Sequence, residues 1–362
     1  MSIYNYFKDF LDFVKFAMTR RWGLGILVFW IFTIGWSSSG FWIQRWNPNY
    51  TPSTKERVKQ LKYIENISWT IHIGSQKYFT TYSTILAWSK TRLWVEMYEF
   101  TKKEIKSTFK TLASNWVNIQ LILENKKFQQ YQNTFKNVQN YLSGFSNFQI
   151  KPDDQMWTKY VHAKFILVDT WFLIQTANFT HSSFFTNREY FFWSHDLKVL
   201  KSLETIFTKD WLWEKIHLED IHPNLVVCPL NCRAITEHLI SSAQSSIAIE
   251  NQYINDPAVA KLLKTQMKKL WTWVQILLAD TSSSADFLWK SDKSLVKTIT
   301  KPYLHAKMLL VDNKILLLSS INLSSNSMDK NREMWILLID TWQIETFKKH
   351  FLIDWKLAKI SK

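Results

Sequence analysis

Two stretches of the sequence decide the fold: VHAKFILVD at residues 161–169 and LHAKMLLVD at residues 304–312. Each contains a His, a Lys two residues later and an Asp seven residues after the His, so both follow the pattern H-x-K-x4-D. The polar residues downstream also match, because His to Asn is 16 and 17 residues and His to Glu is 27 and 28. A pattern that recurs together with its trailing residues predicts an internal repeat.

The residue types of this repeat predict phosphoester chemistry. The first copy contributes His162, Lys164, Asp169, Thr176, Asn178 and Glu189, and the second contributes His305, Lys307, Asp312, Ser320, Asn322 and Glu333. Imidazole can attack phosphorus or protonate a leaving group near neutral pH. Lys and Asn can hold phosphate oxygens, and a carboxylate can orient an imidazole through its second nitrogen. We therefore expect two facing copies to place one His on each side of a single phosphorus.

The pattern also predicts local geometry. Residues i and i+2 of a strand point to the same face, so we expect the His and Lys of each H-x-K to project together from a strand. No cluster of residues has the spacing of metal ligands, and we expect neither a metal nor another cofactor.

Apolar runs and amphipathic segments alternate in the same order in both halves. The predicted elements are strand 93–100, helix 101–114, strands 117–124, 161–168, 172–177 and 188–192 and helix 196–207, then helix 233–243, strand 246–253, helix 258–269, strands 274–279, 304–311, 315–320 and 332–339 and helix 344–354. This order predicts an α/β fold of two fused, pseudo-twofold-related sandwich lobes, at residues 66–215 and 216–362.

The N-terminal region has a different composition. Residues 1–21 are amphipathic and rich in Phe, and residues 22–44 contain no charged residue over a length that can span a bilayer. We predict a retained membrane anchor, and a cleaved signal sequence is the alternative. Lys15, Arg20 and Arg21 precede this stretch and Arg45 follows it, which favours extracytoplasmic catalytic lobes. Polar residues 45–65 with two Pro predict a linker.

The net charge predicts polyanionic partners. The 362 residues include 45 Lys and Arg against 30 Asp and Glu, a formal charge of +15. Such a charge favours an anionic phospholipid membrane or nucleic acid. The sequence does not predict an oligomeric state beyond one site per chain.

The two Cys residues, Cys228 and Cys232, form an isolated C-x3-C. No second pair or His cluster at zinc spacing accompanies them, which argues against a zinc site. We expect unpaired structural residues, with a local disulfide as the alternative in an oxidising compartment.

The chain has 6 Gly and 20 Trp, whereas an average chain of this length has about 25 Gly. Trp116, Trp273 and Trp342 lie between predicted helices and strands, where a left-handed cap or a tight turn favours Gly. We hypothesise that many of these Trp are Gly in the native protein, through a UGA codon reassigned to Gly. The alternative is a protein that is rich in Trp.

The tandem H-x-K-x4-D motifs with their downstream Asn and Glu resemble the phospholipase D superfamily over residues 66–362. The segment Cys228-Pro229-Leu230-Asn231, which leads into a helix, is similar to bacterial cardiolipin-synthase-like members. The resemblance implies two fused α/β lobes and a covalent phosphohistidine intermediate.

The resemblance also implies residue roles. His162 would be the nucleophile and His305 the general acid that later activates water or an acceptor alcohol. The residues that would bind phosphate are Lys164, Lys307, Asn178 and Asn322. The hydroxyls retained at Thr176 and Ser320 would also contact the phosphate. The carboxylates of Glu189 and Glu333 would orient the histidines, and Asp169 and Asp312 would have second-layer or structural roles.

The sequence departs from the family pattern in two places. Gln175-Thr176 and Ser319-Ser320 stand where the family usually has Gly-Ser, and the bulk of Gln175 is expected to narrow the pocket. Cardiolipin synthases of this kind commonly have two membrane spans, and this chain has one candidate. Three functions remain open: a phospholipid hydrolase or phosphatidyltransferase, a membrane-tethered endonuclease, and a non-catalytic binding module.

Overall fold

The computed structural model describes residues 51–68, 70–74, 76–126, 134–279 and 293–360. The chain divides into two compact units, Met1–Ser53 and Thr54–Lys362, and the description below concerns the second. The predicted amphipathic segment 1–21 and the predicted span 22–44 lie outside the described residues. Within the described ranges, none of the helices combines the length and the hydropathy that crossing a bilayer requires.

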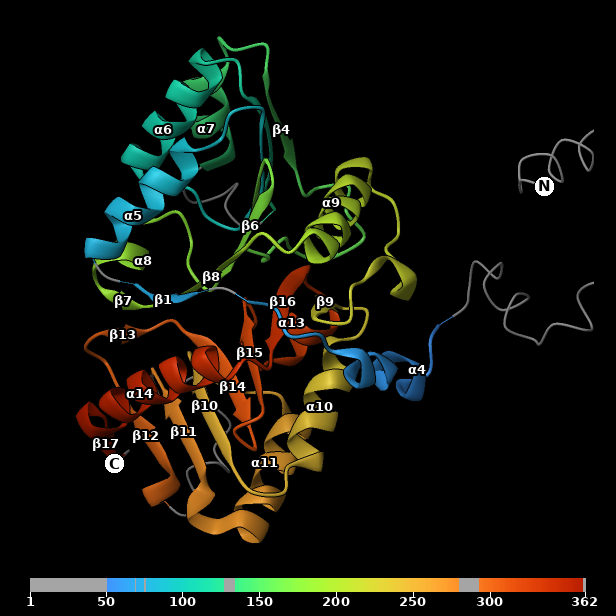
Figure 1. The fold of residues 1–362 in the computed structure, drawn as a ribbon, viewed down its shortest axis with the longest axis vertical. Coiled ribbons are helices and arrows are strands. Elements are labelled where there is room, and N and C mark those ends of the chain that lie inside the picture. Colours follow the sequence, from blue (N-terminus) through green and yellow to red (C-terminus); the bar gives the residue numbers. More distant parts are fainter. Residues whose placement is uncertain (1–50, 69, 75, 127–133, 280–292, 361–362) are drawn as a thin grey trace, which may run out of the picture. The chain divides into compact units, whose positions relative to one another are not determined.

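The first lobe is built on a seven-stranded mixed sheet with the order β1-β8-β6-β5-β2-β3-β4 (Figure 1). Its strands are β1 (Ile71–Ile73), β2 (Arg92–Met97), β3 (Asn118–Leu123), β4 (Phe148–Pro152), β5 (Phe165–Val168), β6 (Trp171–Gln175) and β8 (Tyr190–Ser194). Strands β2, β3 and β4 are parallel, and the other neighbours are antiparallel.

The second lobe repeats this topology. Its sheet has the order β9-β16-β15-β14-β10-β11-β12-β17, and β10, β11 and β12 are its parallel strands. The strands are β9 (Leu225–Cys228), β10 (Ile247–Asn251), β11 (Val274–Leu278), β12 (Val296–Thr298), β14 (Lys307–Val311), β15 (Ile315–Ser319), β16 (Glu333–Leu338) and β17 (Lys359–Ile360). Strand for strand, the order matches the first lobe, with β17 added at one edge, so the predicted repeat of α/β lobes is present.

Helices cover both faces of each sheet. The helices of the first lobe are α5 (Gln76–Ala87), α6 (Lys103–Ser114), α7 (Thr134–Leu142), α8 (His181–Phe185) and α9 (Leu197–Leu212). Those of the second are α10 (Cys232–Ser242), α11 (Pro257–Leu270), α13 (Ser325–Asp329) and α14 (Thr341–Leu357). Short 3-10 turns occur at η2 (Leu218–Asp220), η3 (Trp271–Trp273) and η4 (Lys293–Leu295). In Figure 1, α9 lies on the side of the first sheet opposite to α5, α6 and α7.

The strand period of two explains how these layers form. Phe165 and Leu167 of β5 face a central core that residues of both lobes share with α9 and α14. Ile166 and Val168 point the other way, into an outer core closed by α5, α6, α7 and α8. Strand β14 alternates in the same manner between the central core and an outer core under α10 and α11. The lobes are therefore joined by continuous apolar packing, as expected for strands with two buried faces.

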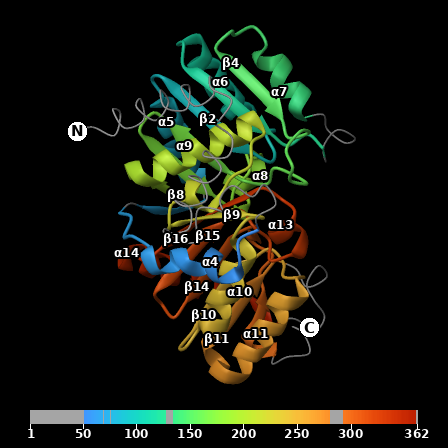
Figure 2. The ribbon, with the colours of Figure 1, turned by 90° about the vertical axis from the view of Figure 1, so that its right-hand side faces the viewer.

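The segment expected to be a linker is partly structured. It contains α4 (Thr54–Val58) and η1 (Lys59–Tyr63), and α4 packs against α10 (Figure 2). The amide of Gln60 donates to the carbonyls of Pro223 and Leu225 at 3.0 and 2.8 Å, and Asn231 donates to Gln60 at 2.8 Å. Residues 54–65 are thereby attached to the second lobe.

The H-x-K motifs differ from the expected continuous strands. Strand β5 begins at Phe165, after His162 and Lys164, while His305 lies between β13 (Tyr303–Leu304) and β14. The reason is that the backbone before each Lys pairs with the opposite lobe. Val161 forms a bridge with Arg332, and β13 pairs in parallel with β7 (Asn187–Arg188).

The cysteines form a disulfide between Cys228 and Cys232, with their Cα atoms 5.2 Å apart. The expectation of unpaired cysteines was therefore wrong. The bond joins the end of β9 to the first residue of α10.

The structure has the predicted left-handed backbone at one of the three Trp positions that the sequence singled out. Trp116 has a φ of 62°, so the predicted left-handed backbone is confirmed there. Trp273 lies in η3 and Trp342 in the first turn of α14, and neither has a positive φ, so the prediction was wrong for both. Trp213 and Trp271, which sequence reasoning did not single out, have φ values of 59° and 49°.

Candidate active site between the lobes

The backbone of each motif histidine is held by the opposite lobe. The N–H of His162 donates to the carbonyl of Arg332 at 2.8 Å, and the N–H of His305 donates to the carbonyl of Arg188 at 3.2 Å. Because the two contacts are equivalent under exchange of the lobes, both histidines lie where the lobes meet.

The histidine side chains are also held across the lobe boundary. Nδ1 of His162 lies 2.7 Å from a carboxylate oxygen of Glu333, and Nδ1 of His305 lies 2.7 Å from Glu189. Both imidazoles are 12% exposed, whereas both carboxylates are fully buried. A carboxylate only accepts hydrogen bonds, so each Nδ1 carries the proton and leaves the Nε2 lone pair of a neutral ring available.

The hydroxyls of Thr176 and Ser320 orient these carboxylates. Thr176 donates to Glu189 at 2.5 Å, and Ser320 donates to Glu333 at 2.6 Å. Both residues are completely buried. A hydroxyl has a single hydrogen to donate. These hydrogen bonds orient the two carboxylates, and the phosphate-binding role expected of Thr176 and Ser320 stays a prediction.

Two further Asn side chains support the same carboxylates. The amide of Asn187 donates to Glu189 at 3.2 Å, and that of Asn331 donates to Glu333 at 3.4 Å. Both Asn residues could have been recognised from the sequence, because each stands two residues before the Glu in the repeated Asn-Arg-Glu.

The two motif lysines are buried beside the histidines. Nζ of Lys164 donates to the carbonyl of His162 at 2.7 Å, and Nζ of Lys307 donates to that of His305 at 2.6 Å. Burial lowers the pKa of Lys164 to about 7 and that of Lys307 to about 8, although Glu189 and Glu333 oppose the shift. The site thus holds cations that an anionic phosphate would stabilise.

Burial also lowers the pKa of both histidines. It lowers the pKa of His162 to about 4; Glu333 opposes this change, and Lys164 and Lys307 add to it. The pKa of His305 is lowered by burial too, with Glu189 opposing and Lys307 adding to the shift. A neutral imidazole with Nδ1 protonated is the form that can attack phosphorus.

The carboxylates remain ionised in spite of their burial. Burial raises the pKa of Glu189 and Glu333, but the facing histidines and lysines and the hydroxyl hydrogen bonds outweigh it, so both pKa values are below the ordinary value. Each carboxylate can therefore stabilise an imidazolium that forms beside it.

Asn178 and Asn322 follow β6 and β15 and are 7% and 6% exposed. Among the described residues, neither side-chain carbonyl oxygen has a hydrogen-bond partner. Their suggested contact with phosphate remains a prediction.

Gln175 turns back onto its own loop, where its amide donates to the carbonyl of Ala177 at 2.8 Å. The side chain is completely buried. The side-chain amide of Gln175 therefore has a hydrogen-bond acceptor within the protein.

Asp169 and Asp312 close the turns at the far ends of β5 and β14. Asp169 accepts from the backbone N–H groups of Lys90, Thr91 and Arg92 at 2.7–3.0 Å. Asp312 accepts from three consecutive N–H groups, of residues 244–246, at 2.7–3.1 Å. These contacts give both residues a structural role, since they tie each hairpin to the chain that enters β2 or β10.

Tyr98 makes the site asymmetric. Its ring lies edge-on to the His162 imidazole with centroids 4.5 Å apart, and Nζ of Lys164 lies 5.2 Å from its centroid. Gln252 follows β10 as Tyr98 follows β2, and it donates instead to the hydroxyl of Tyr303 at 2.8 Å. Sequence reasoning missed Tyr98 because it fell inside the predicted strand 93–100 and belongs to no motif, whereas β2 ends at Met97.

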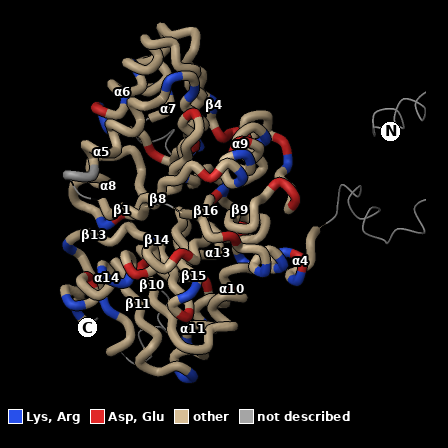
Figure 3. The backbone as a smooth tube through the Cα atoms, in the orientation of Figure 1, with Lys and Arg blue, Asp and Glu red and all other residues tan. Residues whose placement is uncertain are grey.

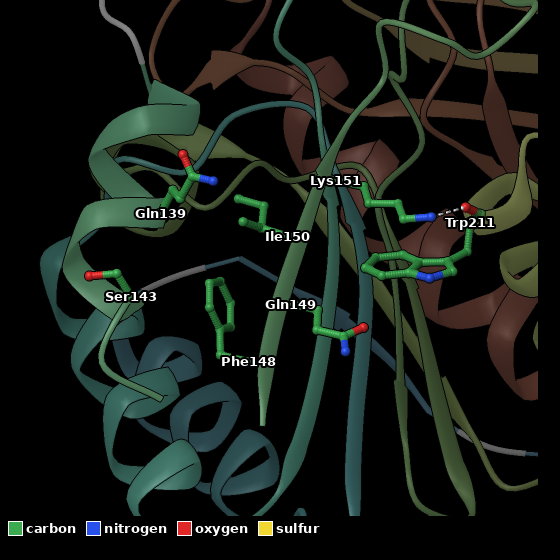
Figure 4. A pocket seen from close by; sticks show the side chains of 7 residues that line it. All are labelled: Gln139, Ser143, Phe148, Gln149, Ile150, Lys151 and Trp211. Atoms are coloured by element: carbon green, nitrogen blue, oxygen red, sulfur yellow. Dashed lines mark hydrogen bonds between the residues drawn. The ribbon is translucent and has the colours of Figure 1, made fainter. Parts of the chain in front are cut away.

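A surface pocket of about 430 Å³ lies elsewhere, beside β4 at the edge of the first sheet. Figure 4 shows its lining side chains, which include Phe148, Ile150, Lys151 and Trp211. None of the motif residues lines it. Across the described ranges, no group of three or more His, Cys, Asp and Glu side chains has an arrangement suited to a metal ion.

Two solved structures share this architecture. Phosphatidylserine synthase from Haemophilus influenzae Rd KW20 matches with a TM-score of 0.64 at 15% identity, over 85% of this chain and 92% of that one. Polyphosphate kinase from Porphyromonas gingivalis matches with a TM-score of 0.60 at 14% identity, over 86% of this chain and 54% of that one. This chain thus spans about half of the polyphosphate kinase, and at these identities the likeness concerns the fold.

A sequence comparison with curated proteins found no match at a significant level. The family model described as "Cardiolipin synthase, PLD-like domain" matches twice, over residues 82–211 and 236–355. The two matches contain the two H-x-K motifs and both lobes' strands β2–β8 and β10–β16. This chain therefore belongs to the phospholipase D-like family of phosphodiesterases and transphosphatidylases, with two copies of the cardiolipin-synthase-type domain.

Proposed function

We propose that this protein hydrolyses or transfers the phosphatidyl group of a phospholipid through a covalent phosphohistidine intermediate. The observation that carries the proposal is the exchanged pair of contacts between His162 and Glu333 and between His305 and Glu189. Two histidines with protonated Nδ1 atoms and two buried lysines form the group set that in-line displacement at phosphorus requires.

In the first step, Nε2 of His162 attacks phosphorus while the bond from phosphorus to the leaving alcohol oxygen breaks. His305 enters this step protonated and gives its Nε2 proton to that oxygen. The positive charge that forms on His162 is stabilised by Glu333, and Lys164 and Lys307 stabilise the phosphate oxygens.

In the second step, neutral His305 takes a proton from water or from an acceptor alcohol. The oxygen of that molecule attacks phosphorus, and the bond from phosphorus to His162 Nε2 breaks. His162 is neutral again and His305 is again protonated, so protons balance over the cycle. The incoming molecule decides between hydrolysis and transfer.

The nucleophilic role of His162 is supported by its environment as well as by the family resemblance. Its pKa of about 4 leaves the ring neutral across the physiological range. Its Nδ1 proton is held by a buried carboxylate, and the Tyr98 ring makes a T-shaped contact with the imidazole.

A phospholipid substrate is supported by the uncharged stretch at residues 22–44 and by the formal charge of +15. A membrane anchor would hold the site beside lipid, and basic charge attracts anionic headgroups. A disulfide between Cys228 and Cys232 fits an oxidising compartment, in keeping with extracytoplasmic lobes.

A membrane-tethered endonuclease is the second candidate, because the same charge also suits nucleic acid. Among the described residues, Figure 3 shows Lys and Arg positions in both lobes, interspersed with Asp and Glu positions. A nucleic-acid substrate would call for a basic track along the site.

The test is product analysis on phosphatidylglycerol vesicles. Full-length protein and its His162→Ala variant are incubated with vesicles, and lipids are analysed by mass spectrometry. Cardiolipin from wild type alone would establish transfer, and phosphatidic acid from wild type alone would establish hydrolysis. If wild type leaves the lipid unchanged but cuts single-stranded DNA in a His162-dependent manner, the endonuclease is the correct function.

A further inference from the structure

Two arginines cross from one lobe into the other beneath the histidines. Arg332 of the second lobe is completely buried, and its guanidinium donates to Asp210 in α9 at 2.8 Å and to the carbonyl of Cys228 at 2.7 Å. Arg188 of the first lobe forms a two-pronged contact with Asp354 in α14 at 2.7 and 2.8 Å. Each lobe therefore inserts an arginine against the last helix of the other lobe.

Each Asp lies next to a second buried acid. Glu96 in β2 adjoins Asp210, and Glu250 in β10 adjoins Asp354 and the hydroxyl of Tyr190. Burial raises the pKa of Glu96, and burial together with Asp354 raises that of Glu250 to about 8. Each network thus places one Arg cation beside two buried acids, and the cation offsets part of the cost of burying their charge in a dry interior.

The arginine backbones hold the histidines directly. Arg332 accepts from the N–H of His162 at 2.8 Å, and its own N–H donates to the carbonyl of Tyr160 at 2.8 Å. The next residue, Glu333, holds the same imidazole through Nδ1. Arg188 and Glu189 stand in the same relation to His305.

We propose that Arg332 and Arg188 are positioning residues that fix the histidine of the opposite lobe, with the buried Asp–Glu pair of that lobe as their counter-charge. The guanidinium anchors a two-residue unit whose backbone sets the position of the histidine and whose Glu sets the orientation of its ring. Sequence spacing marks both networks, because His to Asp210 is 48 residues and His to Asp354 is 49.

The test compares Arg332→Met and the isosteric Asp210→Asn with the control Arg233→Met. Arg233 also binds acidic groups, Asp256 at 2.7 Å and Asp329 at 2.6 Å, but all three lie in the second lobe, and the carboxylates that hold the histidines are others, Glu333 and Glu189. We measure kcat and KM on the lipid substrate. In the full chain with 15N-labelled His, we also record the Nδ1–H resonance that disappears in His162→Ala.

Arg332→Met and Asp210→Asn are expected to lower kcat by about 10- to 100-fold with little change in KM, and to weaken the His162 resonance. Arg332→Lys is expected to recover part of both. Arg233→Met is expected to lower the melting temperature while leaving kcat and the resonance unchanged. Both Arg332→Met and Asp210→Asn are made, so that one still tests the inference if the other fails to fold.

A wild-type kcat and an unchanged resonance in folded Arg332→Met or Asp210→Asn would overturn the inference. The kinetic arm rests on the proposed function, whereas the resonance needs no substrate. Wild-type protein without any phosphodiesterase activity would therefore refute the function, and the resonance would still decide the positioning role.

A separate observation concerns three tryptophans. Trp116, Trp213 and Trp271 have φ values of 62°, 59° and 49° and are 78%, 37% and 64% exposed. Each follows a helix at its C-terminal end, the place where Gly is the common residue because a Cβ is strained there. For Trp271, with a ψ of −124°, the backbone lies in a region that Gly alone adopts readily.

Trp211 and Trp355 behave differently. They occupy equivalent positions after Asp210 and Asp354, and each ring stacks on a Phe of its own helix at 5.9 and 5.8 Å. A Lys lies 4.7 Å from the ring of Trp211 and 4.5 Å from that of Trp355, but Lys151 also lies 4.6 Å from the ring of Trp213, so the stacking on a Phe is what distinguishes Trp211 and Trp355. Such packing requires the indole.

We infer that Trp116, Trp213 and Trp271 are Gly in the native protein, through reassignment of their codon, whereas Trp211 and Trp355 are Trp. Trypsin cleaves after Lys209 and Lys215, so one peptide contains both Trp211 and residue 213. Mass spectrometry of protein from its own cells is expected to find Trp at 211 and Gly at 213 in that peptide. Trp at residues 116, 213 and 271 would overturn the inference.

Discussion

The carboxylate of Glu333 accepts a hydrogen bond from Nδ1 of His162 at 2.7 Å, although the two residues are 171 positions apart and belong to different lobes. Glu189 and His305 form the reciprocal contact. Neither lobe therefore contains a complete histidine–carboxylate pair of its own, and the chemistry depends on how the two lobes dock.

Glu333→Gln is expected to lower kcat by about 100-fold or more. A Gln amide can donate to Nδ1 of His162, which moves the ring proton to Nε2 and removes the attacking lone pair. Rapid-quench measurement of phosphoenzyme should show slower formation. The matched variant Glu189→Gln should accumulate phosphoenzyme with an activated ester, since that leaving group needs no acid while the second step still needs His305 as base. Equal phosphoenzyme time courses of the two variants with an activated ester would contradict the assigned roles.

His162→Ala is expected to abolish turnover, because no other nucleophile faces the phosphorus in the proposed mechanism. His305→Ala should form the phosphoenzyme with activated esters and then accumulate it, since the base for the second step is missing. Acid-quenched protein analysed for phosphohistidine would separate the two variants. Full activity in His162→Ala would refute a single site shared by the lobes.

The pH dependence of kcat/KM follows from the shifted pKa values. Activity requires neutral His162, whose pKa is about 4, so kcat/KM should fall below that pH. His305 must be protonated, and burial places its pKa below 6.5, so the decline on the alkaline side should begin below pH 6.5. It should steepen between pH 7 and 8 as Lys164 and then Lys307 lose their protons. In Lys164→Arg the loss of kcat/KM between pH 7 and 8 should be smaller, because a guanidinium stays charged.

Thr176→Val and Ser320→Ala each remove a hydroxyl that donates to a buried carboxylate. Each is expected to destabilise the fold by about 1–3 kcal/mol, the usual cost of leaving a buried polar group unpaired. Thermal unfolding would measure that loss, and kcat should fall with KM nearly unchanged. A raised KM with normal kcat would instead support the phosphate-binding role.

The repeat made much of the fold predictable. The H-x-K spacing and the matching order of apolar runs predicted two α/β lobes, and the strand orders of the two sheets agree with that prediction. Short or polar edge elements were missed, such as β12 (Val296–Thr298) and the helix α7 (Thr134–Leu142), because so few residues hold little periodicity. The Cys disulfide was also not favoured, since two cysteines at that spacing are compatible with either state.

The amino-acid sequence was sufficient to name the motif residues, because their chemistry and spacing repeat along the chain. It did not reveal that Glu333 accepts a hydrogen bond from His162 or that Arg332 forms an ion pair with Asp210. Nor did it reveal that Thr176 and Ser320 donate to the carboxylates. Those pairings follow from burying a central apolar core between the two lobes, which brings the Arg-Glu unit of each lobe against the histidine of the other. Spacing within one copy of a repeat contains no information about docking between copies, so only the folded chain decides which carboxylate meets which imidazole.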